Sequence, residues 1–480
     1  MSDKQVAFVA DGQIPERAPP PSTTGVLGWL RENMFSSITN SILTILSILF
    51  LAWMIPGMVQ WAFIDGVWSA ASLKECRAVA NVPALQAIAQ TLGMSIDGAA
   101  FSAAGGLVEQ EAFLRNALGE EAGRLDLHHG ACWAVIVERF DQFIYGFYPH
   151  EERWRPNLAF VLLLVAIVPA LFDNVPYRGF GLMFSASYPI VAYWLIWGGS
   201  FWGIVAFIAA FAVAYGVFRV VTEVMQGEGA TVAACLGLVA AVAWMLFAID
   251  PVTDAIDSII PLGLEKVASN KLGGFLLATI LGVAGIVLSL PIGILLALGR
   301  RSGMIFIRSI CVVFIEFIRG VPLITLLFVA NVVLNYFFPP GTAADIILRV
   351  VIMITIFASA YMAEVIRGGL AALPQGQYEA ADSLGLDYWK SMRLIIMPQA
   401  LKVSIPNIVS SFIGLFKDTT LVVVIGLLDP VGLIGTTRAD SAWNGIIWEF
   451  YVFVGLFFFI VCFGMSRYSM YLERKLKTDR

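Results

Sequence analysis

The sequence predicts an all-α integral membrane protein with about ten transmembrane helices. Of its 480 residues, 59% are hydrophobic and only 14% are charged, and the mean hydropathy is +0.81. A soluble domain carries roughly 25% charged residues. The apolar residues also gather in runs of about 20 residues, which is the length that crosses a bilayer as a helix.

Ten apolar runs follow one another along the chain. One of them is longer than one crossing needs and is interrupted by Gly320 and Pro322. We therefore expect there either a short helix followed by a span or one kinked helix. The expected spans lie near 40–61, 157–173, 179–198, 203–222, 231–250, 273–298, 306–337, 345–368, 403–428 and 446–468.

The polar segments between the spans suggest a division of the chain. The first 35 residues are polar and proline-rich, which is typical of disorder. A long polar segment follows the first span, and two stretches within it, 105–120 and 131–148, have the pattern of amphipathic helices. We expect a disordered cytoplasmic tail over 1–38, a first transmembrane helix over 39–64, a helical cap outside the cytoplasm over 65–156, accessory spans over 157–270, a core over 271–470 and a cytoplasmic tail over 471–480.

Lysine and arginine residues predict the orientation, because they are enriched in short cytoplasmic loops. They cluster at 300–308, at 390–402 and at 467–480. With ten spans, all three clusters lie on the same side if both termini are cytoplasmic. The cap then lies on the opposite side of the membrane.

The cysteines and histidines predict no metal site. Cys76 and Cys132 lie in the expected cap, where an oxidising compartment would allow a disulfide. The alternative is two buried free thiols. The spacing of the five cysteines and three histidines matches no metal-binding pattern. The chain also lacks the G-x-x-x-x-G-K-[ST] sequence of a P-loop, so we expect it to bind no ATP and to be no enzyme.

The polar segment 376–398 has the features of two short helices joined by a turn. Gly385 can adopt the left-handed conformation that ends the first helix, expected over about 376–384. Asp387 can cap the second helix, which we expect to end near Pro398. The segment is either an ordinary loop or a docking surface, in which Ala380 and Ala381 would allow another subunit to approach closely.

The spacing in this segment resembles the EAA loop of ABC importer permeases. Glu379, Ala380 and Ala381 form the triplet, and Gly385 and Pro398 follow the glutamate by 6 and 19 residues. Other stretches resemble the polar amino-acid branch of this family, and within it the larger permease of general L-amino-acid importers. They are GIVLSLPIGILLALGRRS, FIEFIRGVPLITLLF, FASAYMAEVIRGGL and FIGLFKDTTLVVVIG in the C-terminal half, and GACWAVIVERFDQFIYGFYP, ERWRPN and YPIVAYWLIWGG before it.

The resemblance implies a permease of the bacterial inner membrane with a type I ABC importer core in its C-terminal half. Its implied partners are a second homologous permease, two copies of an ABC ATPase that hold ATP and Mg, and a periplasmic binding protein that delivers an L-amino acid. The implied ATPase-coupling residues are Tyr378, Glu379, Ala380, Ala381, Asp382, Gly385 and Pro398.

Charged residues within spans are candidates for the substrate path, because they are costly there. Glu316 and Arg319 are three residues apart and share a helix face, so they form either a structural ion pair or a site for the substrate carboxylate. Lys417 and Asp418 point about 100° apart on a helix, so one can face the partner permease while the other faces the path; the alternative is a structural contact between helices. The hydroxyls of Thr419 and Thr420 complete the candidates. Glu364 and Arg367 are expected to brace the loop.

Other classes of function fit the sequence less well. A transporter driven by an ion gradient would explain the spans and their charges, but not the EAA spacing, and no inverted repeat is visible. A membrane receptor would use the cap but not the charged core spans. A membrane enzyme lacks a visible nucleophile and base.

Overall fold

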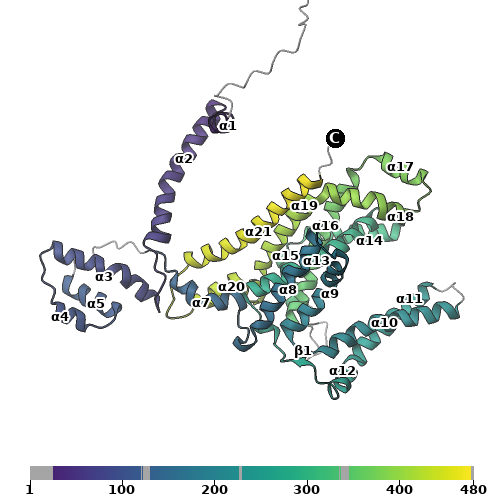
Figure 1. Cartoon of the computed structure of the whole chain (residues 1–480), viewed down its shortest axis with the longest axis horizontal. Coiled ribbons are helices and arrows are strands. Elements are labelled where there is room, and N and C mark those ends of the chain that lie inside the picture. The colour runs from purple at the N-terminus through teal and green to yellow at the C-terminus, as the bar shows by residue number, and fades with distance from the viewer. Residues whose placement is uncertain are drawn as a thin grey trace, which may run out of the picture. The chain divides into compact units, whose positions relative to one another are not determined.

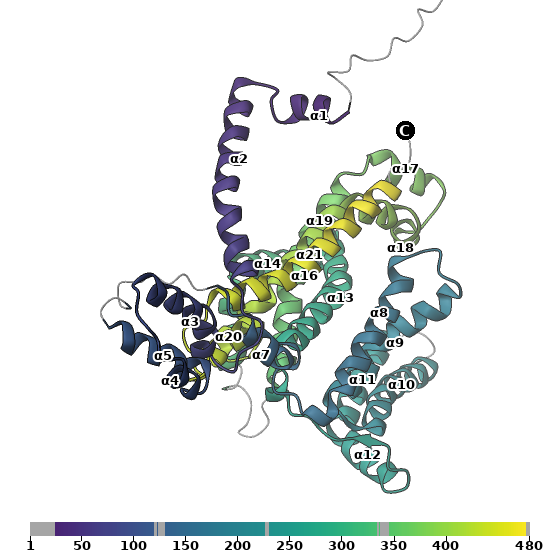
Figure 2. The same cartoon turned by 60° about the vertical axis from the view of Figure 1, so that its left-hand side comes forward.

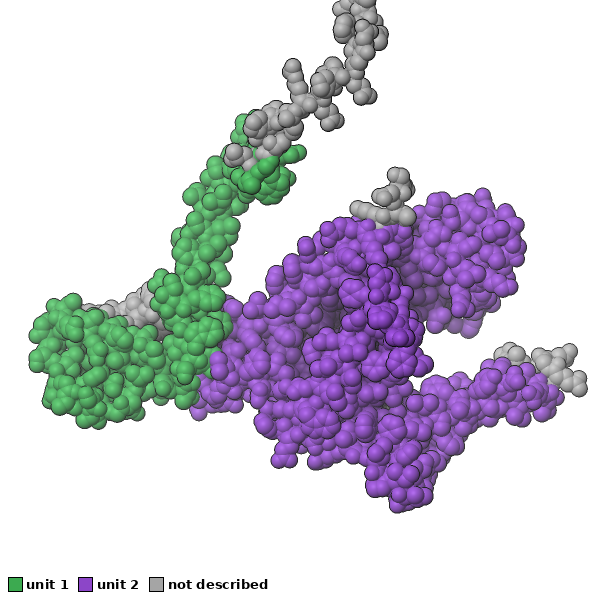
Figure 3. Space-filling view, in the orientation of Figure 1, with its two compact units in different colours: residues 1–135 green, residues 136–480 purple. Residues whose placement is uncertain are grey.

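The computed structural model describes residues 25–119, 122, 130–225, 230–333, 336 and 345–476. The chain forms two compact units, residues 1–135 and residues 136–480 (Figure 3). The division falls within the predicted cap of 65–156. Residues 136–156 therefore belong to the second unit.

The first unit consists of a long apolar helix and a group of shorter helices. Residues 25–33 are helical, although we predicted a disordered tail over 1–38. Their apolar side chains, among them Val26 and Trp29, follow the proline-rich stretch and recur at helical spacing. In the remainder of the predicted tail, residues 34–37 form a turn and bends and Ile38 begins the next helix, whereas residues 1–24 lie outside the described part of the chain. The helices are α1 (Gly25–Asn33), α2 (Ile38–Val59) with a π-turn over Gln60–Ile64, α3 (Leu73–Thr91), α4 (Gly98–Ala103) and α5 (Leu107–Leu118).

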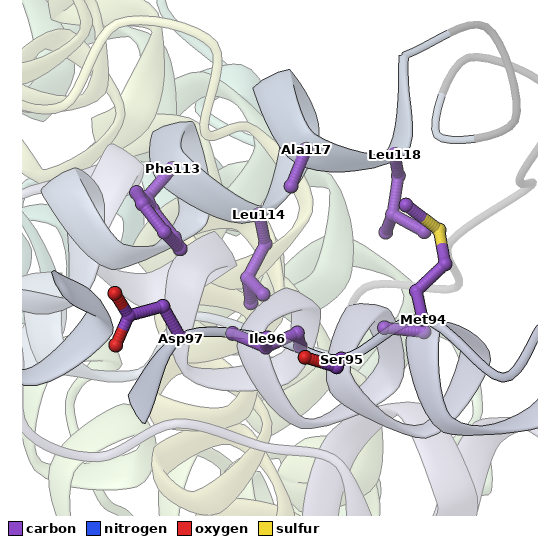
Figure 4. A pocket seen from close by; sticks show the side chains of 9 residues that line it. Met94, Ser95, Ile96, Asp97, Phe113, Leu114, Ala117 and Leu118 are labelled. Carbon is purple, nitrogen blue, oxygen red and sulfur yellow. The ribbon is translucent and has the colours of Figure 1, made fainter. Parts of the chain in front are cut away.

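Helices α3 and α5 enclose a small apolar core. Leu85 and Leu114 are fully buried in it. Beside this core lies a cavity of about 250 Å³, with Leu114 and Phe113 on one wall and Ile96 on the other (Figure 4). Cys76 of α3 and Cys132 form a disulfide, with their Cα atoms 5.9 Å apart. The two cysteines are 56 positions apart in the sequence, so this bond closes a long loop and ties α3 to the C-terminal end of the first unit.

The first part of the second unit consists of helices, four of them long and apolar, with a short two-stranded sheet. Strand β1 (Gly199–Ser200) pairs antiparallel with β2 (Gly263–Leu264), so that the chain returns to the end of α9 after three further helices. Helices α8 and α9 pack along each other, and so do α10 and α11 (Figure 2). The helices are α7 (Ala134–Tyr145), α8 (Trp154–Leu171), α9 (Arg178–Trp197), α10 (Phe201–Val224), α11 (Ala230–Phe247) and α12 (Ile249–Asp257).

The remainder of the second unit is a bundle in which α13, α16, α19 and α21 lie side by side (Figure 1). Helices α13 and α16 are in especially close contact. A Cβ atom added at Gly293 would lie only 2.7 Å from Cβ of Met362. The helices are α13 (Gly274–Arg300), α14 (Ile305–Gly320), α15 (Leu323–Phe328), α16 (Ile346–Ala371), α17 (Gln375–Ser383), α18 (Tyr388–Ser391), α19 (Met397–Asp418), α20 (Pro430–Arg438) and α21 (Trp448–Leu476).

The helices of the described chain account for the predicted spans. Eight are long and apolar enough to cross a membrane, and two bent pairs raise the number to at most ten. One pair, Ile305–Gly320 and Leu323–Val333, is bent by 101° at the predicted break between Gly320 and Pro322. The described part of this apolar run, up to residue 333, is therefore two helices of different direction and not one kinked span. The fold is all-α and multi-pass, as predicted.

The ends of α8, α9 and α21 meet at one place. Asp173, between α8 and α9, lies 2.7 Å from Nζ of Lys475 and 2.9 Å from Nη2 of Arg178. The Tyr468 hydroxyl donates a hydrogen bond to the Leu171 carbonyl. The predicted C-terminal tail of 471–480 begins within α21, because this helix continues to Leu476. Residues 477–480 lie outside the described part of the chain.

Candidate functional site

The predicted coupling segment forms two helices with a turn, as the sequence indicated. Helix α17 ends at Ser383, and Gly385 follows with a φ of 67°, in the left-handed region. Asp387 then caps α18, because its side chain accepts a hydrogen bond from the Lys390 amide. This hydrogen bond holds the pKa of the exposed Asp387 carboxyl below its usual value. In both views, α17 lies near the C-terminal end of α21 (Figures 1 and 2).

The predicted end of the second helix near Pro398 is wrong. Helix α18 continues through a π-turn over Met392–Ile396 into α19, and Pro398 lies in the first turn of α19. Proline lacks an amide hydrogen and normally interrupts the helical ladder. Here the π-turn has already shifted the hydrogen bonds by one residue, so the helix passes through the proline.

The exposed surface of the segment differs from the predicted one. Glu379, Ala380 and Asp382 are exposed, but Ala381 is fully buried within its own unit. Ala381 therefore packs the loop and offers no surface to a partner. Four large apolar side chains that the sequence did not single out are exposed on the segment: Leu384, Tyr388, Trp389 and Leu394. The sequence itself contains this information, because apolar residues in a polar loop indicate an interaction surface.

Tyr378 attaches this segment to the ends of two core helices. Its hydroxyl accepts a hydrogen bond of 3.1 Å from Nη1 of Arg301 and donates one of 3.2 Å to the Leu370 carbonyl. The Arg301 guanidinium also lies 5.6 Å from the centre of the Tyr378 ring, a distance typical of a cation–π contact. Tyr378 thus contacts both the residue after α13 and the last turn of α16.

Glu316 and Arg319 belong to a larger group of charges. Arg300 Nη1 lies 2.9 Å from Glu316 Oε1 and 2.6 Å from Glu364 Oε1. Arg367 Nη2 lies 3.0 Å and Arg319 Nη1 3.7 Å from Glu364 Oε2. The direct contact between Glu316 and Arg319, at 4.0 Å, is the longest of these. We call these five residues the Glu364 cluster: Arg300, Glu316, Arg319, Glu364 and Arg367.

The residues at the end of α19 are placed differently from one another. Asp418 is half-buried and lines a cavity of about 270 Å³, whereas Lys417 is exposed. Thr419 is fully buried, and its hydroxyl donates to the Phe416 carbonyl; the Thr420 hydroxyl donates to the Lys417 carbonyl. Both threonine hydroxyls thus use their hydrogens within the helix, which becomes a 3-10 helix at Thr419.

The cavity beside Asp418 is bounded by α16 and α19. It is mostly apolar, with Ser411 and the Tyr361 ring as further polar groups in its wall. The Arg319 guanidinium lies 5.6 Å from the centre of the Tyr361 ring. The Tyr361 ring therefore contacts Arg319 and lines the same cavity as Asp418, although the two candidates are 99 positions apart in the sequence.

Among the described residues, no three His, Cys, Asp or Glu side chains are close enough to hold a metal ion. His128 and His129 lie outside the described residues.

The second unit is thus a helical membrane bundle that carries a small cavity, a charge cluster and an attached surface loop.

Comparisons with known proteins match this architecture. A family model described as "Binding-protein-dependent transport system inner membrane component" matches residues 289–478. The Rhodobacter capsulatus "Glutamate/glutamine/aspartate/asparagine transport system permease protein BztC" is 49% identical over 480 residues, which cover 100% of both chains. The Escherichia coli "Inner membrane amino-acid ABC transporter permease protein YhdY" is 36% identical over 468 residues, or 97% of both chains.

Solved structures also match part of the chain. The "Crystal structure of an amino acid ABC transporter with histidines" has 29% sequence identity and a TM-score of 0.38, covering 41% of this chain and 90% of that one. The two relatives above are aligned over nearly the whole of both chains and exceed 30% identity. The chain therefore belongs to the amino-acid ABC transporter permeases, and it is a multi-pass inner-membrane permease of an amino-acid importer.

Proposed function

We propose that this chain forms part of the path for an L-amino acid and couples it to a separate ATPase through residues 376–398. The observation that carries the proposal is the form of this loop. Its acids Glu379 and Asp382 and its apolar Leu384 and Trp389 are exposed on a segment that Tyr378 attaches to the core. An exposed apolar patch rimmed by charge is typical of a protein interface.

The proposed assembly contains a second homologous permease, two copies of the ATPase and a periplasmic binding protein. In this assembly the ATPase binds ATP and Mg, and the described residues of this chain include no group of metal ligands. Both termini face the cytoplasm, because the basic residues at 300–308, 390–402 and 467–475 then lie on one side. The ion pairs of Asp173 with Arg178 and Lys475 support the placement of the start of α9 and the end of α21 on the same side of the membrane.

The cavity beside Asp418 is the proposed contact with the substrate. An amino acid carries an ammonium group and a carboxylate, and each needs a partner in a low-dielectric site. Asp418 supplies the negative partner within the cavity wall, and the Ser411 hydroxyl, which donates to the Asn407 carbonyl, supplies a neutral acceptor. The name of the Rhodobacter capsulatus relative gives acidic amino acids and their amides as its substrates, and we propose the same class here.

Uptake into vesicles tests this function. The complex is purified from its native membrane by a tag on this chain, reconstituted with its binding protein, and supplied with labelled glutamate and glutamine. We expect uptake that requires enclosed ATP and persists when ionophores dissipate ion gradients. Uptake that an ion gradient drives without ATP would instead identify a secondary transporter.

A further inference from the structure

The Glu364 cluster lies between the coupling loop and the proposed substrate cavity. Its members come from the last residue of α13, from the C-terminal part of α14 and from the C-terminal part of α16. Fully buried apolar side chains pack these three helices together next to it, among them Ile315, Ala297 and Ile366. The cluster therefore fixes three helix ends with respect to one another.

Glu364 is the central residue of this cluster. Its side chain is 16% exposed, against 53% for Glu316, and it has three guanidinium groups within 4 Å. Arg300 and Arg367 donate hydrogen bonds to different oxygens of its carboxylate. Without the charge of Glu364, three cations would face each other with only the more exposed Glu316 to balance them. Like charges this close, and partly desolvated, repel strongly.

Contacts leave the cluster in two directions. Toward the loop, Arg300 is followed by Arg301, which binds the Tyr378 hydroxyl and lies over the Tyr378 ring. Toward the cavity, Arg319 lies over the ring of Tyr361, which lines the cavity together with Asp418. Side-chain contacts, together with the backbone link between Arg300 and Arg301, thus join the EAA loop to the cavity wall.

Arg300 contacts two acceptors at once, Glu316 on α14 and Glu364 on α16. A shift of the end of α13 relative to α16 would change how this guanidinium is shared between the two carboxylates. Coupling between distant sites requires an element with more than one discrete arrangement, and a shared ion pair is such an element. The exposed position of Glu316 allows it to follow such a shift at low cost.

We propose that Glu364 is a positioning residue that transmits movement of the EAA loop to the Tyr361 wall of the substrate cavity, through Arg300 and Arg319. The inference rests on the proposed function, because it concerns how ATP hydrolysis by the partner is converted into opening of this path. It assigns to the cluster a role beyond bracing the loop.

The test compares Glu364→Gln with the unchanged complex in reconstituted vesicles. Glutamine keeps the size of the side chain and one hydrogen-bond acceptor but removes the charge. The readout is the number of amino acids taken up per ATP hydrolysed, measured together with retention of the ATPase during purification. We expect the ATPase to be retained and ATP hydrolysis to continue, while uptake per ATP falls at least about fivefold, the lower end of typical coupling effects.

Two further variants keep the test decisive. Arg308→Gln removes an exposed cation from α14 outside the cluster and should leave uptake per ATP unchanged. Arg367→Gln removes one partner of Glu364 at a half-exposed position, and should lower uptake per ATP to an intermediate value even if Glu364→Gln prevents assembly. An unchanged ratio in assembled Glu364→Gln, or in Arg367→Gln, would overturn the inference.

A merely structural role would also be recognised. Uptake and ATP hydrolysis would then fall in the same proportion, leaving their ratio unchanged, which again overturns the inference. If the unchanged complex shows no ATP-driven uptake, the proposed function itself fails. If the unchanged complex transports normally and the Glu364→Gln and Arg367→Gln variants keep the same uptake per ATP, the proposed function stands but the role of Glu364 does not.

Discussion

The two units of this protein are stabilised by different means. In the first unit, a disulfide supports the small apolar core between α3 and α5. In the second, long apolar helices pack closely, and the charged residues among them are paired across helices. A small domain lacks the buried area to be stable alone and commonly relies on disulfides. A large membrane bundle needs no covalent link, but each charge within it needs a partner.

This difference shows where function can be sought. We expect changes of exposed acids in the first unit to have little effect on transport, and changes of the paired or cavity-lining charges of the second unit, such as Glu364 and Asp418, to have larger effects. Four substitutions test that contrast, beginning with the largest expected effect.

Reversing the charge of Glu379 should give the largest effect. Glu379 is exposed on α17, so Glu379→Lys should leave the fold intact but place a cation where the proposed ATPase surface binds an acid. A lost interfacial charge contact of this kind costs about 2–5 kcal/mol. Co-purification of the ATPase with the tagged permease measures the effect. Glu109→Lys, at an exposed position of α5, is the matched control and should retain the ATPase. Full retention by both variants would refute a docking role for Glu379.

Neutralising Asp418 should affect transport without affecting assembly. Asp418→Asn keeps the shape of the cavity wall but removes the proposed partner of the substrate ammonium group. We expect uptake to fall by at least about tenfold, equivalent to about 1.4 kcal/mol, with the ATPase still bound. The adjacent Lys417→Gln, at an exposed position, should have a much smaller effect. Equal effects of both variants would mean that the cavity is not the substrate contact.

Removing the disulfide should destabilise the first unit alone. The bond between Cys76 and Cys132 closes a long loop, and such a loop closure contributes about 4 kcal/mol in the simple entropy model. The double variant Cys76→Ser with Cys132→Ser should make α3 and α5 more susceptible to proteolysis and hydrogen exchange. Peptides from α13 and α16 should be protected as before. Equal loss of protection in both units would show that they are one cooperative structure.

The smallest effect on transport is expected at Asp429, which caps α20 and makes the stability of the fold depend on pH. Burial raises the pKa of this carboxyl to about 6, although the amides of Gly432 and Val431 partly oppose the shift. Because the folded pKa is above the unfolded one, the protonated form is favoured by folding. This contribution is complete below about pH 4 and is lost as the pH rises through about 6.

At pH 7 the loss amounts to at most about 3 kcal/mol. Asp429→Asn keeps the helix cap without a titrating group, so the slope of thermal stability between pH 4 and 6 should decrease. Asp429→Ala removes both cap and charge and should be less stable than Asp429→Asn by about 1 kcal/mol. A variant Asp429→Asn with an unchanged slope would exclude Asp429 as its origin. Unfolding in detergent, followed at several pH values, measures both effects.

The sequence predicted the local features of the coupling loop, because they depend on neighbouring residues. The turn at Gly385 and the cap at Asp387 follow from the chemistry of glycine and aspartate themselves. Pro398 misled the prediction, since the π-turn before it has no simple sequence signal. Burial of Ala381 was also not predictable, because it depends on the packing of α17 within the folded unit.

The charge cluster illustrates a second limit. The spacing of Glu316 and Arg319 indicated a helical pair, yet the shortest contacts of Glu316 and Glu364 are with Arg300, which lies 16 and 64 positions away in the sequence. Such contacts depend on how α13, α14 and α16 pack, and this packing cannot be read from the spacing of residues in the sequence. Tyr361 was missed for the same reason, since a tyrosine in an apolar span is ordinarily part of the core.

The central claim is that ATP hydrolysed by a partner moves an amino acid along this chain. The most direct measurement is uptake of labelled glutamate and glutamine by vesicles that contain the complex purified through this subunit, with ATP and ion gradients varied separately. The account predicts co-purification of a second permease and an ATPase, and uptake that follows ATP alone. Recovery of this chain by itself, with uptake driven by an ion gradient and indifferent to ATP, would contradict it.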